Sequence, residues 1–157
     1  MSIARESNAD VIRAYAASDR EACLRLFDGN VPDFFVASER QDFMHFLERE
    51  GLGRSYLVIT RAGRIVACGG YAIESDGVTA SLAWGMVDRV LQRSGLGSRL
   101  TEARLRAARS VPGVMQVRLD TSQHTQGFYA RFGFQVIAIR KDGYAPELDR
   151  WDMLLRF

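Results

Sequence analysis

A strand that leads directly into a glycine-rich turn and a long helix is the most constraining feature of this sequence. The apolar segment from Val78 to Val87 predicts a strand, and the segment Gln92-x-x-Gly95-x-Gly97 follows it. Apolar residues then recur at helical spacing, at Leu96, Leu100, Ala103 and Ala107. Glycines at the start of a helix let the backbone approach a bulky anion, and the unpaired N–H groups of the first turn point at its charge. The segment therefore predicts a phosphate-binding loop.

Two other phosphate-binding motifs are excluded. A P-loop requires Lys-Ser/Thr after its last glycine, whereas Gly97 is followed by Ser98-Arg99. The dinucleotide-binding fingerprint requires a third glycine at position 100, which is Leu100. A bare Gly-x-Gly also occurs in purely structural turns, but the upstream Gln92 and the strand-to-helix context favour a binding loop.

A second motif lies further along the chain. The segment from Ser122 to Phe134 predicts a short helix that ends at Gly133 and leads into a strand, with Phe128-Tyr129 inside the helix. Taken with the glycine-rich loop, in this order and at this spacing, it resembles the GNAT superfamily of N-acetyltransferases, which bind acetyl-coenzyme A. The resemblance extends more loosely over residues 11 to 157.

The resemblance implies one GNAT domain over residues 1–157, with residues 1–10 as a loose tail or edge segment. The implied fold is α/β, of the α+β type. It is the acyl-CoA N-acyltransferase fold, with a mixed, largely antiparallel central sheet of about six to seven strands flanked by about four helices. Three predicted antiparallel strands before the loop exclude a doubly wound parallel sheet.

Hydrophobic periodicity and turn residues predict the individual elements. The predicted strands cover 11–15, 56–60, 64–73, 78–87, 114–120, 134–140 and 151–157, and the predicted helices cover 18–28, 39–50, the stretch after Gly95 and a short piece around Tyr129. Gly51 and Gly53 are predicted to end the second helix, and Arg61-Ala62-Gly63 to form a hairpin turn. The segment from Lys141 to Arg150 is predicted to be a surface loop.

By the resemblance, one set of residues holds the cofactor. The predicted cofactor-binding residues are Gly85, Met86, Val87, Gln92, Arg93, Ser94, Gly95, Leu96, Gly97, Ser98 and Ser122. Gly85 lies inside a strand, where glycine often marks a bulge, and the exposed backbone there is expected to pair with the pantetheine amides. The alternative is a glycine tolerated beneath an aromatic residue such as Trp84.

The sequence departs from the family pattern at three positions. Arg89 stands where proline is common, Ser122 where asparagine is common, and Thr125 where alanine is common. The family asparagine helps to hold the pantetheine arm. A serine hydroxyl is shorter and has fewer hydrogen-bonding atoms, so the sequence leaves open whether Ser122 makes the same contact with the pantetheine arm.

Tyr129 is the predicted catalytic residue, because the family tyrosine at this place commonly protonates the departing thiolate. A thiol has a pKa of about 8.5 and a phenol of about 10, so such a transfer is feasible. The alternative is an aromatic residue that only anchors the short helix. The segment Ala80 to Met86 lacks the glutamate that several relatives use as a general base. Other candidates are Glu74, Asp76, Asp120 and His124, and water-relayed deprotonation is equally compatible.

The predicted function is transfer of acetyl from acetyl-CoA to a primary amine of a small molecule, peptide or protein, by direct attack in a ternary complex. The alternative is a non-catalytic coenzyme A-binding sensor or interaction domain of the same fold. The two N-terminal helices and the Lys141–Arg150 segment are expected to face the acceptor, with Phe34, Phe35 and Tyr144 among their aromatic residues.

Charge and composition restrict the partners. The net charge of +2 does not support nucleic-acid binding. Every basic residue except Lys141 is arginine, so the arginines around the long helix are predicted to form a solvated face. They are Arg89, Arg93, Arg99, Arg104, Arg106 and Arg109, and the first three are candidate phosphate neighbours.

Cysteine usage and hydropathy complete the expectations. Cys23 and Cys68 follow no metal or redox spacing and are expected to be buried, and no metal site is predicted. Without an apolar stretch of membrane-spanning length or a secretory signal, a cytoplasmic protein with no membrane partner is expected. A homo-oligomer is compatible with the sequence, which does not indicate the oligomeric state.

Overall fold

The computed structural model describes residues 10–49 and 55–157. The predicted tail, apart from Asp10, and the predicted helix end at Gly51 and Gly53 lie outside the described residues. Within them, no helix has the length and apolar character needed to cross a bilayer.

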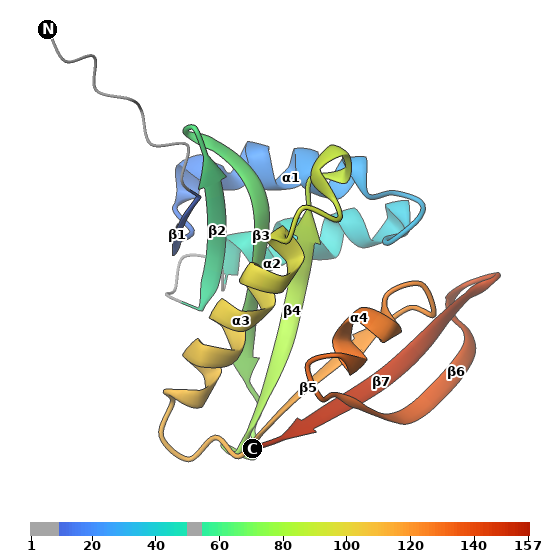
Figure 1. The fold of residues 1–157 in the computed structure, drawn as a ribbon. Helices are drawn as coiled ribbons and strands as arrows, with labels where there is room; N and C mark the ends of the chain where they lie inside the picture. The colour runs from blue at the N-terminus through green and yellow to red at the C-terminus, as the bar shows by residue number, and fades with distance from the viewer. Residues whose placement is uncertain (1–9, 50–54) are drawn as a thin grey trace, which may run out of the picture.

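Seven strands form one sheet in the described chain, in the order β1-β2-β3-β4-β5-β7-β6 (Figure 1). Their bounds are β1 Val11–Ala14, β2 Tyr56–Arg61, β3 Arg64–Ile73, β4 Thr79–Val87, β5 Gln116–Thr121, β6 Gln135–Ala145 and β7 Leu148–Arg156. Every neighbouring pair is antiparallel except β4 and β5, which are parallel. The predicted mixed, largely antiparallel sheet is confirmed.

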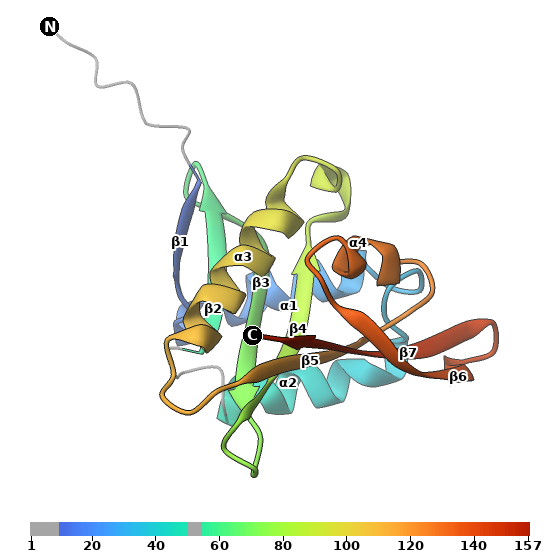
Figure 2. The ribbon, with the colours of Figure 1, turned by 60° about the horizontal axis from the view of Figure 1, so that its bottom comes forward.

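Four α-helices flank this sheet in the described residues. They are α1 Arg20–Gly29, α2 Arg40–Arg49, α3 Leu96–Arg109 and α4 Gln126–Ala130. Helices α1 and α2 cover one face and α3 covers the other (Figure 2). Phe27 of α1 and Phe43 of α2 pack with Tyr56 of β2 in one core cluster, whereas Leu96 and Leu100 of α3 pack in another. The expected burial of Cys23 and Cys68 is confirmed, and both thiols are free.

Local turn chemistry explains the hairpin between β2 and β3. Ala62 and Gly63 both have positive φ, +50° and +75°, as a two-residue turn between right-twisted strands requires. The predicted turn at these residues is confirmed.

The predicted surface loop from Lys141 to Arg150 is wrong. Strand β6 continues to Ala145 and β7 begins at Leu148, so most of the segment belongs to a hairpin. Strand β6 is exposed along nearly its whole length, and its side chains therefore show no alternation between apolar and polar. Backbone pairing with β7 holds it in place, and this pairing leaves no periodic signal in the side chains.

Strands β4 and β5 separate soon after they meet. They pair only from Thr79 to Ser81, and β4 then continues without a partner strand on that side (Figure 1). Between the pairs Cys68–Met86 and Gly70–Ala83, two residues of β4, Trp84 and Gly85, lie opposite one residue of β3. Trp84 has a φ of +50°. The bulge expected at Gly85 is therefore present, at the point where the sheet opens.

Candidate functional site

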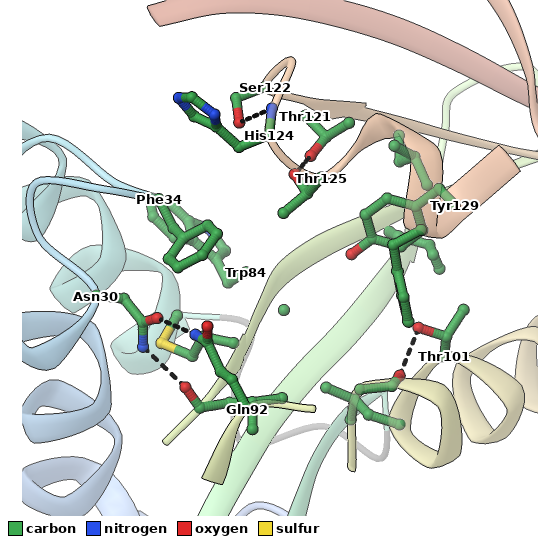
Figure 3. Close-up of a pocket in the computed structure, with 18 of the residues that line it drawn as sticks. Asn30, Phe34, Trp84, Gln92, Thr101, Thr121, Ser122, His124, Thr125 and Tyr129 are labelled. Atoms are coloured by element: carbon green, nitrogen blue, oxygen red, sulfur yellow. Dashed lines mark hydrogen bonds between the residues drawn. The ribbon is translucent and has the colours of Figure 1, made fainter. Parts of the chain in front are cut away.

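A cleft of about 990 Å³ occupies the opening between β4 and β5 (Figure 3). The second half of β4, the first turn of α3, the segment leading into α4 and α4 itself line it. The connection from α1 to α2 contributes Phe34, Phe35 and Glu39, and the β6–β7 hairpin contributes Tyr144. The cleft is large enough for an extended ligand and is lined by both backbone edges and side chains.

The glycine-rich turn opens onto this cleft at the N-terminus of α3. Gly95 caps the helix with a φ of +86°, and a side chain there would meet nothing within 4 Å. Gly95 is therefore required by conformation and not by space. At Gly97, a Cβ atom would lie 3.4 Å from the ring of Phe128. The first N–H groups of an α-helix have no intrahelical partner, so the start of this 14-residue helix can bind an anion.

Most of the residues predicted from the sequence lie on the cleft. Those that line it are Gly85, Met86, Val87, Gln92, Arg93, Gly95, Gly97, Ser98, Ser122 and Tyr129. Two predicted residues do not line it. Ser94 is exposed, and its hydroxyl donates to the carbonyl of Leu91. Leu96 is 1% exposed and packs in the core beside Leu100.

A buried asparagine that sequence reasoning missed ties three parts of the site together. Asn30 is 2% exposed and follows α1. Its Nδ2 donates to the carbonyl oxygens of Leu26 (2.8 Å) and Val87 (3.0 Å), and its Oδ1 accepts from Gln92 Nε2 at 3.0 Å (Figure 3). The Val87 carbonyl, expected to be free for the cofactor, therefore already has a partner. The asparagine lies 57 and 62 residues from these two partners, so no local motif indicates it.

The hydroxyl of Ser122 supports the turn that leads into α4. It accepts from the backbone N–H of His124 at 3.2 Å, and Ser122 is 4% exposed (Figure 3). The hydroxyls of Thr121 and Thr125 are hydrogen-bonded to each other across the same turn. These bonds fix the direction in which α4 leaves the sheet.

Tyr129 of α4 directs its hydroxyl into the cleft (Figure 3). Its ring packs edge-on against Phe128 and Phe134. The Nη2 atom of Arg104 donates to the phenolic oxygen at 3.5 Å. The tyrosine is thus held by its ring on one side and touched by a cation at its hydroxyl.

The prediction of a solvated arginine face is wrong for Arg104, which is 2% exposed. This residue follows Leu100 by four positions and precedes Ala108 by four, so it lies on the buried stripe of α3. That spacing is the sequence signal that could have found it. Of the arginines expected near phosphate, only Arg93 lines the cleft.

Arg89 and Arg99, the other two arginines expected near phosphate, have carboxylate partners. Arg89 forms an ion pair with Asp33 and lies over the ring of Phe34. Arg99 forms an ion pair with Asp10 at 2.6 Å. Both side chains are partly exposed, so these pairs leave their guanidinium groups accessible to solvent.

The candidate bases separate into two groups. Glu74 accepts from Ser81, and Asp76 accepts from the N–H of Val78, and neither acid lines the cleft. A hydrogen bond from the Thr79 hydroxyl lowers the pKa of Asp76.

Asp120 and His124 do line the cleft, and so does Glu39, which sequence reasoning did not consider. Burial raises the pKa of Glu39, with a smaller contribution from the negative charge of Asp120. Asp120 accepts from the hydroxyl of Tyr144, and burial raises the pKa of that tyrosine far above its ordinary value. Asp120 also forms an ion pair with Arg150 at 3.9 Å, so Glu39 is the one carboxylate on the cleft that has no ion-pair partner among the described residues.

Across residues 10–49 and 55–157, no three His, Cys, Asp or Glu side chains are grouped so that they could hold a metal ion.

Comparisons with known proteins agree with this geometry. A sequence model described as acetyltransferase (GNAT) domain matches residues 52–136. No curated protein matches the sequence.

Among solved structures, Ard1 from Thermoplasma volcanium is 22% identical, with a TM-score of 0.79 over 94% of this chain and 97% of that one. The ribosomal-protein-S18-alanine N-acetyltransferase from Escherichia coli is 21% identical, with a TM-score of 0.75 over 94% of each chain. Rv2747 from Mycobacterium tuberculosis, solved in complex with CoA and NLQ, is 19% identical, with a TM-score of 0.73 over 94% of this chain and 99% of that one.

Proposed function

Because the chain belongs to the GNAT acetyltransferase family and is therefore an acyltransferase, we propose that it moves acetyl from acetyl-CoA to a primary amine. The acceptor is a small molecule, a peptide or a protein, and the amine attacks directly in a ternary complex. One observation carries the proposal: the N-terminus of α3 and the hydroxyl of Tyr129 face the same cleft.

The small electrostatic stabilisation of an anion by a helix N-terminus favours a long ligand with further contacts. A helix N-terminus stabilises a nearby anion by only about 0.3–1 kcal/mol, or roughly 2 when partly buried, whereas micromolar affinity requires about 8 kcal/mol. Backbone N–H groups around Gly95 and Gly97 and the unpaired edge of β4 must supply the rest. Coenzyme A suits this arrangement, because its diphosphate and its amide-containing arm are joined in one chain. Rv2747, which has a similar fold, was solved with CoA bound.

Two groups on the cleft divide the reaction. The carboxylate of Glu39 attracts an ammonium group. A carboxylate with a raised pKa is a better base, so Glu39 is the proposed acceptor of the ammonium proton, directly or through water. The neutral nitrogen then attacks the thioester carbonyl, and Tyr129 protonates the departing sulfur.

Acetyl-CoA titration by calorimetry tests binding, and release of free thiol with a panel of amines tests turnover. We expect both. Absence of heat from the cofactor would end the proposal, and binding without thiol release from any amine would instead support the non-catalytic alternative.

The role of Tyr129 is tested by Tyr129→Phe, which removes only the hydroxyl. We expect turnover to fall by about 10²–10⁴-fold with cofactor affinity nearly unchanged, because general acid catalysis contributes a factor of that size. Tyr71→Phe is the matched control, since Tyr71 of β3 does not line the cleft. Equal turnover in the two variants would remove Tyr129 from the mechanism.

A further inference from the structure

Arg104 of α3 is a buried cation that has no acidic partner. It is 2% exposed, and no carboxylate of the described residues lies within 4.0 Å of its guanidinium group. Its Nε has no hydrogen-bond partner there. Its side chain makes one hydrogen bond in the described structure, from Nη2 to the phenolic oxygen of Tyr129 at 3.5 Å.

Two glycines on adjacent strands make room for this side chain. A Cβ atom on Gly85 would lie 2.7 Å from Nη1 and 2.8 Å from Nη2 of Arg104. A Cβ atom on Gly69 of β3 would lie 3.0 Å from the Cα of Gly85 and 3.4 Å from the Cδ of Arg104. The bulge and both glycines therefore leave the sheet bare where the guanidinium group lies.

Folding alone gives no reason for a charge at this position. Burial of an ionised group without a counter-charge is unfavourable, and replacing buried charges with apolar residues of similar volume is often neutral or stabilising. The nearby hydroxyl of Tyr56 donates to the carbonyl of Trp84, so it offers no compensating negative charge. A methionine could follow the same path without the unsatisfied nitrogen. What distinguishes the arginine is its contact with Tyr129 at the cleft.

We propose that Arg104 is a positioning residue that orients the hydroxyl of Tyr129 for proton donation to the departing thiolate. The inference rests on the proposed acetyl transfer. An N–H of Arg104 donates to the phenolic oxygen, so the phenolic hydrogen cannot point at the guanidinium group and is directed into the cleft. The positive charge also stabilises the phenolate that remains after the proton has left.

The step balances with the groups present. The neutral amine nitrogen forms a bond to the acetyl carbon, the C–S bond breaks, and its electron pair leaves with sulfur. The phenolic proton of Tyr129 moves to that sulfur and gives the free thiol. The nitrogen loses its extra proton to Glu39, directly or through water, and the phenolate regains one from solvent. The products are an N-acetyl amine and coenzyme A.

The test combines Arg104→Met with Tyr129→Phe, singly and together. We expect Arg104→Met to lower kcat by about 10–100-fold, because orienting the donor supplies part of the roughly 10²–10⁴-fold that a general acid contributes. The dissociation constant for acetyl-CoA should change far less than kcat, since the predicted diphosphate site lies elsewhere and the guanidinium group lies against only the Gly85 part of the predicted pantetheine edge. In the Tyr129→Phe background, Arg104→Met should have no further effect on kcat.

Two measurements separate positioning from a structural role. Thermal unfolding of Arg104→Met should occur at the same temperature as in the wild type or higher, because an uncompensated charge has been removed. Arg104→Lys should recover part of kcat, since it keeps the charge but not the planar fork. Arg106→Met on the exposed side of α3 is the matched control and should leave kcat unchanged.

Several outcomes would overturn the inference. They are multiplicative losses of kcat in the double variant, a large drop in Tm for Arg104→Met, and a raised KM for the acceptor with kcat intact. The last would indicate that Arg104 binds an acceptor carboxylate. Each of these leaves acetyl transfer by the wild type standing. A wild-type protein that turns over no amine would instead overturn the proposed function, and this inference with it.

Discussion

Replacement of Asn30 by alanine should loosen the junction between α1, β4 and the glycine-rich turn. The substitution removes three hydrogen bonds, two to carbonyl oxygens and one from Gln92. Each contributes about 0.5–1.5 kcal/mol, so we expect the free energy of unfolding to fall by about 2–4 kcal/mol. For a domain of this size, that loss lowers Tm by roughly 5–15 °C. Urea unfolding followed by circular dichroism measures the loss in the free energy of unfolding.

Two further variants identify the source of the loss. Gln92→Ala removes one of the three bonds, and its coupling energy with Asn30→Ala should be about 0.5–1.5 kcal/mol in a double-mutant cycle. Asn30→Asp keeps the acceptor but faces a carboxylate toward two carbonyl oxygens, so it should be less stable than Asn30→Ala at neutral pH.

Gln41→Ala, at an exposed position of α2, is the matched control and should stay within about 0.5 kcal/mol of the wild type. A loss below about 1 kcal/mol for Asn30→Ala, or zero coupling with Gln92, would refute the assignment of Asn30 as a tie between these segments.

Two more predictions concern the glycine-rich turn and the start of α1. Gly95→Ala should destabilise the free protein by about 1–2 kcal/mol, because the residue must keep a φ of +86°. Gly97→Ala lies inside α3 and should be neutral or up to about 1 kcal/mol stabilising. Both should weaken acetyl-CoA binding in calorimetry, and unchanged affinity would place the diphosphate elsewhere. Asp19 accepts two hydrogen bonds from Arg13, which lower its pKa below the ordinary value of 3.8. The ionised Asp19 therefore stabilises the folded state above about pH 4, and this contribution is lost as the pH falls further. Asp19→Asn should reduce stability at pH 7 by about 1 kcal/mol and flatten the loss of stability below about pH 4 in urea titrations; parallel curves for the two proteins would contradict this.

Local signals account for the parts of the fold that could be predicted. The β2–β3 hairpin combines two apolar runs with a glycine turn, and the predicted strand 64–73 has the observed bounds of β3. The predicted strands 134–140 and 151–157 overlap β6 and β7, but the continuation of β6 to Ala145 could not be predicted, because that part of the strand is largely exposed. Its position depends on pairing with β7, which side-chain periodicity does not report.

The candidate site divides in the same way. Gly95 and Tyr129 belong to short motifs, and the fold brings both onto one cleft. Asn30 could not be found, because its partners Val87 and Gln92 are remote in the chain. Arg104 was assigned to solvent because arginine is abundant throughout, although its spacing from Leu100 placed it on the buried stripe.

The short contact between β4 and β5 has a practical consequence for finding the acceptor. Only three residue pairs join these strands, so the two halves of the sheet meet along a narrow seam. A ligand bound in the cleft between β4 and β5 contacts both halves of the sheet. A ligand that binds only the folded form raises the unfolding temperature. Melting curves recorded in the presence of coenzyme A and a library of amines would therefore rank acceptors before any product is known.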